Sequence, residues 1–268
     1  MTVLLHVSDP HFGAEVPHVV EALEGLAREL RPDLLVLSGD VTQRARRAEF
    51  AAAREFLARL SVPQVLTIPG NHDIPLFNVA ARAAAPYAGF QRVFGPELEP
   101  SFHAADCLVL GVKTTRRYRH VDGEISDEQR ERVAARLREA SSAQLRIVVL
   151  HQPVAVPRET EQKNVVHGHA AAVQSWAEAG ADVLLAGHIH LPFMLPLHES
   201  RPLPRPLWAI NAGTAVSSRV RYDAGNSVNV LRTAEPPSAG RATVEHWTYR
   251  EPQRAFLRSA RLELGESG

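Results

Sequence analysis

The sequence contains very little cysteine, and it has neither a long hydrophobic run nor an excess of one charge. Cys107 is the only cysteine in 268 residues, which excludes an intramolecular disulfide and gives no sign of secretion. The longest apolar runs, such as 34–37 and 147–150, are far shorter than the roughly 20 residues that span a bilayer. The start lacks a basic leader and a cleavage site. These features predict a cytoplasmic protein with no membrane span.

The charges of the chain cancel. Lysine and arginine total 30, as do aspartate and glutamate, so the formal net charge is zero. A dedicated binder of nucleic acid would normally carry a basic excess, so this balance argues against such a partner.

Histidine, by contrast, is plentiful, with 13 residues. Because histidine is the commonest metal ligand and a frequent general acid or base, its distribution along the chain matters.

Short apolar segments alternate with segments of helical periodicity, which predicts an α/β fold with parallel strands joined by crossovers. The less regular stretch 71–104 predicts short helices and a loop, and the proline-rich stretch 192–206 predicts a surface loop. Short β-like pieces follow at 207–211, 228–231 and 243–249. We expect a single domain over 1–268, with strands over 3–7, 34–38, 65–68, 107–112, 147–150 and 183–186, and helices over 16–30, 47–60, 126–139 and 169–179.

Five of the predicted strands are followed directly by aspartate, histidine or asparagine. Because ligands of open α/β sheets bind beyond the carboxyl ends of the strands, we expect these side chains to meet at one edge of the sheet. Glycines in these turns would let the backbone approach a small, crowded site. The glycines are Gly39, Gly70 and Gly187, and the ligand-type residues are Asp9, His11, Asp40, Asn71, His151, His188 and His190.

Seven such ligands are too many for one tetrahedral zinc ion. They fit two transition-metal ions about 3.5–4 Å apart that share a carboxylate. Imidazole and carboxylate ligands without thiolate suit manganese, iron or zinc better than magnesium or calcium. The sequence therefore predicts a centre of two divalent or trivalent transition-metal ions.

The ordered set Asp9-x-His11, Gly39-Asp40, Gly70-Asn71-His72-Asp73, His151 and Gly187-His188-x-His190 resembles the calcineurin-like metallophosphoesterases. The resemblance implies a four-layer α-β-β-α sandwich, with the C-terminal β-like pieces in the second sheet. It also implies that one metal takes Asp9, His11, Asp40 and His190. The other would take Asp40, Asn71, His151 and His188, with Asp40 bridging the two.

The predicted reaction is hydrolysis of a small phosphodiester by hydroxide that the two metals make available near neutral pH. His72 does not fit the metal count, and its position between Asn71 and Asp73 suggests that it protonates or polarises the leaving oxygen. Asp73 is expected to hold the His72 ring and to raise its basicity, as carboxylates behind a working histidine do.

The substrate is less well defined than the chemistry. The Gly-Asn-His-Asp block and the chain size look similar to bacterial cyclic-nucleotide phosphodiesterases, although residues 74–78 lack the arginine that often follows this block in those proteins. A lipid-precursor or nucleotide-sugar pyrophosphohydrolase and a nuclease of the same superfamily are alternatives, the former requiring a wide apolar groove. An inactive binding scaffold on this fold is the alternative from another class.

Several further residues carry a weaker signal. The arginines at 44, 46 and 47 and those at 116, 117 and 119 could bind a second anionic group, or form basic surfaces. His167 and His169 imitate a ligand pair but precede a helix, and residues 211–214 follow a strand and could reach the site. The loop at 192–206 and the strands at 207–250 could form the edge of a homodimer.

Overall fold

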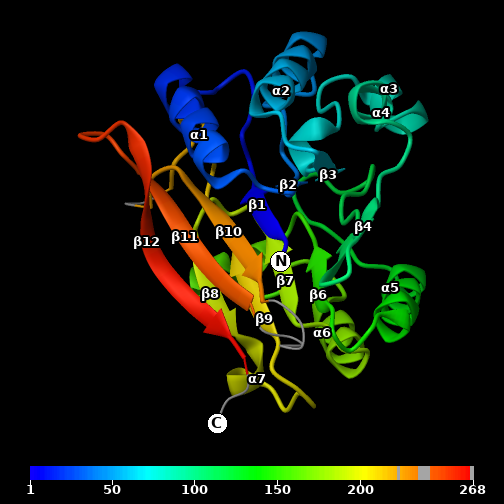
Figure 1. The fold of residues 1–268 in the computed structure, drawn as a ribbon. Helices are drawn as coiled ribbons and strands as arrows, with labels where there is room; N and C mark the ends of the chain where they lie inside the picture. Colours follow the sequence, from blue (N-terminus) through cyan, green and yellow to red (C-terminus); the bar gives the residue numbers. More distant parts are fainter. Residues whose placement is uncertain (222–223, 235–241, 266–268) are drawn as a thin grey trace.

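The chain folds into two six-stranded mixed sheets that pack face to face between layers of helices (Figure 1). The computed structural model describes residues 1–221, 224–234 and 242–265. In spatial order, the first sheet contains β12 (Ala255–Leu264), β11 (Ala242–Arg250), β10 (Ser227–Thr233), β1 (Val3–Val7), β2 (Leu34–Ser38) and β3 (Gln64–Ile68). The second contains β4 (Ser101–His103), β5 (Cys107–Gly111), β6 (Leu145–Val149), β7 (Val183–Ala186), β9 (Trp208–Asn211) and β8 (Phe193–Pro196).

The helices begin and end where local chemistry favours it. The side chain of Ser126 accepts a hydrogen bond from the backbone N–H of Gln129 and so caps α5. Helix α1 begins at Pro17, where the missing N–H costs nothing, and ends before Arg31 in the left-handed conformation. The helices are α1 (Pro17–Leu30), α2 (Arg47–Leu60), α3 (Val79–Ala84), α4 (Ala88–Phe94), α5 (Asp127–Glu139), α6 (His169–Glu178) and α7 (Leu197–Ser200), with 3₁₀ turns η1 (Asn71–Asp73) and η2 (Glu159–Asn164).

Alternation of side chains along the strands produces three apolar layers. In β1, Leu5 and Val7 pack with residues of α1 and α2, whereas Leu4 packs between the two sheets. On the far side, residues of the second sheet such as Val148 pack with Trp176 of α6. The predicted four-layer α-β-β-α sandwich is therefore confirmed.

The placement of the C-terminal strands corrects one expectation. Of the three β-like pieces, only the one at 207–211 lies in the second sheet, as β9. Strands β10 and β11 instead extend the first sheet, because β10 pairs antiparallel with β1 in the register Val3↔Arg232. The expected loop at 192–206 also contains regular structure, since β8 pairs with β9 and α7 follows it.

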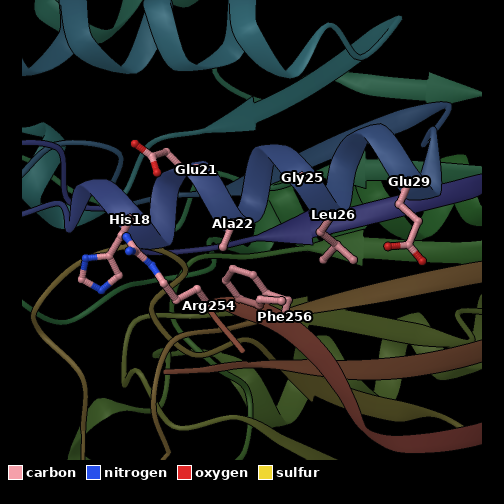
Figure 2. A pocket seen from close by; sticks show the side chains of 9 residues that line it. His18, Glu21, Ala22, Gly25, Leu26, Glu29, Arg254 and Phe256 are labelled. Atoms are coloured by element: carbon pink, nitrogen blue, oxygen red, sulfur yellow. The ribbon is translucent and has the colours of Figure 1, made fainter. Parts of the chain in front are cut away.

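Strand β12 is an element that the sequence reasoning missed. It pairs antiparallel with β11 and packs beside α1, where Phe256 lies near Ala22 and Leu26 (Figure 2). A hollow of about 440 Å³ opens between the two elements, lined also by charged residues such as Glu21 and Arg254. Among the helices of the described residues, none combines the length and the apolar composition that a membrane span requires.

Candidate metal centre

The polar blocks meet where strands of both sheets end. The loops after β1, β2 and β3 come from the first sheet, and those after β6 and β7 come from the second. Backbone hydrogen bonds from Asp9 N–H to Gly39 O and from His11 N–H to Asp40 O join the first two loops. The expectation that all five strand ends share the edge of one sheet was wrong, because the site is assembled across the interface between two sheets.

Five of the predicted ligands have an unusual backbone conformation. Asp9, His11, Asp40, His188 and His190 all have positive φ values, between 45° and 68°. Residues with a side chain adopt this region rarely, and a residue held there costs of order 1–3 kcal/mol. The concentration of such residues at one place indicates a site whose geometry the surrounding structure enforces.

The three glycines of these turns are required by close contacts. A Cβ atom on Gly187 would lie 1.8 Å from Ser8 Oγ, and one on Gly39 would lie 2.5 Å from the ring of His151. On Gly70, it would lie 2.1 Å from the backbone nitrogen of Asp40. The expectation that these glycines allow close approach of the backbone is confirmed.

Asp9, His11 and His190 form the first group of candidate ligands, and all three are buried. His11 Nε2 lies 3.0 Å from His190 Nε2, and His190 Nε2 lies 3.3 Å from Asp9 Oδ1. Oxygen Oδ2 of Asp40 lies 3.7 Å from His11 Nε2. The ring of His190 is oriented by a hydrogen bond on its other side, since His190 Nδ1 donates to the Arg219 carbonyl at 2.6 Å.

Asp40, His151 and His188 form the second group. Oxygen Oδ1 of Asp40 lies 3.3 Å from His151 Nε2, and Asn71 Oδ1 lies 3.2 Å from the same nitrogen. His151 Nδ1 donates to the carbonyl of Ser38 at 2.8 Å, which turns Nε2 toward the group. The two oxygens of Asp40 thus face the two groups, one each.

The charges within the cluster are strongly coupled. Burial lowers the pKa of His11 and of His188 to about 3, so these rings are neutral. Burial also opposes charge on His151, but the carboxylate of Asp40 outweighs it and raises the pKa of His151 to about 9. Burial opposes ionisation of Asp40 too, and His151 and His72 nevertheless hold its pKa well below the usual range.

These residues fit a pair of transition-metal ions. Asp9 Oδ1 and His188 Nδ1 are buried polar atoms that have no hydrogen-bond partner within the described part of the chain. Such orphaned atoms are costly unless something else binds them. The donors are carboxylate, imidazole and amide groups without thiolate, which is typical of manganese, iron or zinc sites. The six residues of the two groups and Asn71 are the seven that the sequence predicts.

His72 lies beside the first group, with its ring centroid 4.8 Å from that of His11. Its Nδ1 is 2.8 Å from the carbonyl of Gln43, so Nδ1 carries the proton. On its other side, Arg219 Nη1 lies 3.3 Å from Nε2 and 3.0 Å from Gln43 Oε1. Sequence reasoning missed Arg219 and Gln43, because neither belongs to a strand-end block of ligand-type residues.

The expected contact between Asp73 and the His72 ring is wrong. The Asp73 carboxylate instead accepts hydrogen bonds from the backbone N–H groups of Gly70, Val41 and Thr42 and from the Thr42 hydroxyl, at 2.8–3.1 Å. Burial and the nearby Asp40 raise the pKa of Asp73 to about 6. Asp73 therefore ties the loop after β2 to the loop after β3.

The residues with weaker signals separate into two kinds. Arg116 donates to the carbonyls of Lys113 and Thr115, and Arg119 pairs with Glu124, so these arginines hold their own loop together. His167 and His169 belong to neither ligand group. By contrast, the Thr214 hydroxyl donates to the Asp9 carbonyl at 2.6 Å, and Arg44 lines a pocket that includes His72. Residues 222–223 and 235–241 of the expected dimer edge lie outside the described residues.

A sequence profile of the calcineurin-like phosphoesterases matches residues 2–192, the segment that carries every predicted ligand. The chain belongs to this family. This calcineurin-like phosphoesterase family member shares 42% identity over 84 residues, 26% of the chain, with "Glycerophosphodiester phosphodiesterase GpdQ" of Enterobacter lignolyticus. It shares 28% identity over 132 residues, 49% of the chain, with "Probable cyclic nucleotide phosphodiesterase" of a Synechococcus species. The matches span 29% and 47%, respectively, of these relatives.

A solved structure shows that the fold extends beyond the matched segment. A dimetal phosphatase from Danio rerio superposes with a TM-score of 0.69 and covers 99% of both chains, at 13% sequence identity. At that identity the likeness concerns the fold alone. The described residues of this family member therefore have the metallophosphoesterase fold, including the C-terminal strands of the first sheet.

Proposed function

We propose that this protein is a metal-dependent phosphoester hydrolase that acts on a small phosphodiester. The observation that carries the proposal is Asp40, whose two carboxylate oxygens face two separate groups of buried ligands. A pair of manganese, iron or zinc ions held there would neutralise phosphate charge and activate water near neutral pH. The names of both relatives, a glycerophosphodiester and a cyclic nucleotide phosphodiesterase, support a diester as the substrate.

The residues of the chain would divide the work by position. Asp9, Asp40 and the histidines of the two groups hold the ions, while Asn71 binds at the second group. A water oxygen bonds to phosphorus, the ester P–O bond breaks, and the leaving oxygen takes a proton. We propose that Arg219, 3.3 Å from His72 Nε2, moves from this nitrogen to a phosphate oxygen. Nε2 of His72 then takes a proton from solvent, to which the attacking water releases its own, and passes it to the leaving oxygen, while Nδ1–H stays bonded to the Gln43 carbonyl.

The test is a metal and substrate panel on the purified chain. We expect manganese titration, followed by removal of free metal and elemental analysis, to give close to two ions per chain. With manganese, bis(4-nitrophenyl) phosphate, 3′,5′-cyclic AMP and glycerophosphoethanolamine should be compared with 4-nitrophenyl phosphate and a nucleotide-sugar pyrophosphate. We expect hydrolysis of diesters at least tenfold faster than of the monoester.

Asp40→Asn is the matched control, because it keeps the size of the side chain and removes the shared charge. We expect this variant to lose metal at both groups and to lose turnover by at least a hundredfold. A chain that binds no manganese and hydrolyses none of the substrates would instead support the inactive scaffold. Faster hydrolysis of the nucleotide-sugar pyrophosphate than of the diesters would support the pyrophosphohydrolase. Cytoplasmic location and the homodimer stay predictions.

A further inference from the structure

The part of the surface beside the metal centre is unusually apolar. Among the described residues, large hydrophobic side chains that are strongly exposed fall mostly in two short segments, 76–79 and 118–121. Phe77 is the most exposed of them, at 74%, although it lies only four residues after the end of the Asn71–Asp73 turn. The members of this apolar rim are Leu76, Phe77, Val79, Tyr118 and Val121.

The two segments of the apolar rim are joined to each other. Arg82 of α3 donates from Nε to the carbonyl of Arg117 at 2.7 Å and from Nη2 to that of Arg119 at 2.5 Å. Arg117 donates back to the carbonyl of Ala83 at 3.1 Å. These bonds fix the loop at 118–121 beside the C-terminal half of α3, so the two segments of the rim are held together.

A pocket opens between the apolar rim and the metal centre. Its apolar lining residues are Ile74, Leu76, Phe77 and Val121, and it is also lined by Asn71 and His72, which lie beside ligands of the metal centre. Its volume is about 200 Å³. A cavity of about 150 Å³ holds one benzene molecule, so this pocket has the size of one aromatic group and is too small for a long acyl chain.

The polar residues of the pocket also suit an aromatic guest. The guanidinium carbon of Arg44 lies 5.6 Å from the centroid of the Phe77 ring, a cation–π distance. Gln43 and His120 are the other polar residues of the wall. A flat ring entering the pocket would stack on the face of Phe77 that Arg44 leaves open, so that Arg44 supports the Phe77 ring from its other face and the ester oxygen of the guest lies near His72.

We propose that this pocket, through Phe77 and Arg44, binds the aromatic group of the substrate, so that the protein prefers phosphodiesters that carry an aryl group or nucleobase. The proposal rests on the proposed function and narrows it to a substrate class. In the reaction, water adds to phosphorus, the P–O bond on the aromatic side breaks, and the freed oxygen leaves with the electron pair and takes a proton. The pocket itself contributes binding and orientation.

The kinetic test compares each variant with the unmodified chain on two diesters, so that the different reactivity of the two substrates cancels. We expect Phe77→Ala to lower kcat/KM for bis(4-nitrophenyl) phosphate by about tenfold and to leave that for glycerophosphoethanolamine within about twofold. Phe77→Tyr, which keeps the ring, should retain the activity on both. Val79→Ala is the matched control, because Val79 is 73% exposed in the same segment and does not line the pocket.

A binding measurement separates this inference from the proposed function. We expect calorimetry to show that phenylphosphonate binds to the manganese-treated chain at least tenfold more tightly than methylphosphonate, and that Phe77→Ala removes the difference. Equal loss on both diesters, or no loss on either, would overturn the aromatic pocket even if the chain is an active phosphodiesterase. If no diester is hydrolysed, the proposed function fails, and the phosphonate comparison still decides whether the pocket selects aromatic ligands.

Discussion

Replacement of Gly70 by alanine would test whether the crowding at the strand ends determines the metal centre. The residue has φ −96° and ψ 179°, an extended conformation open to any amino acid, so dihedral strain plays no part. The obstacle is space. The new Cβ would lie 2.1 Å from the backbone nitrogen of Asp40 and 2.2 Å from its Oδ1, where real contacts stay above 3.0 Å.

The clash must be relieved by a shift of backbone of nearly an ångström, because the nearest atom belongs to the main chain. Overpacking of this kind costs about 1–3 kcal/mol of stability. The same shift moves Asp40, whose Oδ1 accepts from His72 N–H at 2.8 Å. A displacement of about 1 Å at a catalytic group can lower the rate a hundredfold. We therefore expect metal binding and turnover to be affected more strongly than the stability of the fold.

We therefore expect Gly70→Ala to lower the free energy of unfolding by about 1–3 kcal/mol and to reduce manganese affinity and diester turnover by about a hundredfold. Urea unfolding, calorimetric manganese titration and initial rates measure the three quantities. Gly25→Ala is the control, since its Cβ would meet only Arg28 Nη2 at 3.9 Å inside α1, and alanine should stabilise that helix by about 0.5–1 kcal/mol. A Gly70→Ala protein with unchanged manganese affinity and turnover would refute the steric reasoning.

Two other predictions concern histidines. His72→Ala should keep both metal ions but lose turnover on an alkyl diester by a factor of about 10²–10⁴. The loss should be smaller on a nitrophenyl diester, because its leaving group needs no proton. Full activity of the variant on the alkyl diester would contradict the role of His72. Burial lowers the pKa of His246 to about 4 from 6.5, so the unfolded chain binds more protons between these pH values. This difference in proton binding should lower the free energy of unfolding by up to about 3 kcal/mol between pH 6.5 and pH 4. In urea unfolding, the free energy of His246→Gln should therefore fall less steeply with decreasing pH than that of the unmodified chain. The same pH dependence in both proteins would count against this role of His246.

The strands and helices that surround the centre could be predicted because each has a local signal. Strands such as β1 and β2 are buried on both faces and therefore appear as continuous apolar runs. The pairing of strands is a different matter, because it depends on non-local contacts. Nothing within 228–231 or 243–249 indicates that these segments extend the sheet of β1 and not the other sheet.

Strand β12 lacked a local signal for a physical reason. It is an edge strand with most of its side chains exposed, and only Phe256 and Leu264 are buried. Charged residues such as Arg258 and Arg261 on an exposed edge discourage pairing with other chains, but they also remove the apolar alternation by which a strand is predicted. Arg219 escaped prediction similarly, since its place beside His72 depends on the path of the loop between β9 and β10.

The error over Asp73 shows why adjacency in the sequence misleads at this site. Asn71, His72 and Asp73 form a 3₁₀ turn, in which successive side chains point about 120° apart. Accordingly, Asn71 faces His151, His72 faces Gln43 and Arg219, and Asp73 faces the backbone of the loop after β2. Consecutive side chains of such a turn therefore contact different parts of the structure. The carboxylate that follows His72 therefore acts on Asp40 and Asn71 instead, because by bonding to Val41 and Gly70 it keeps the two loops that carry these ligands side by side.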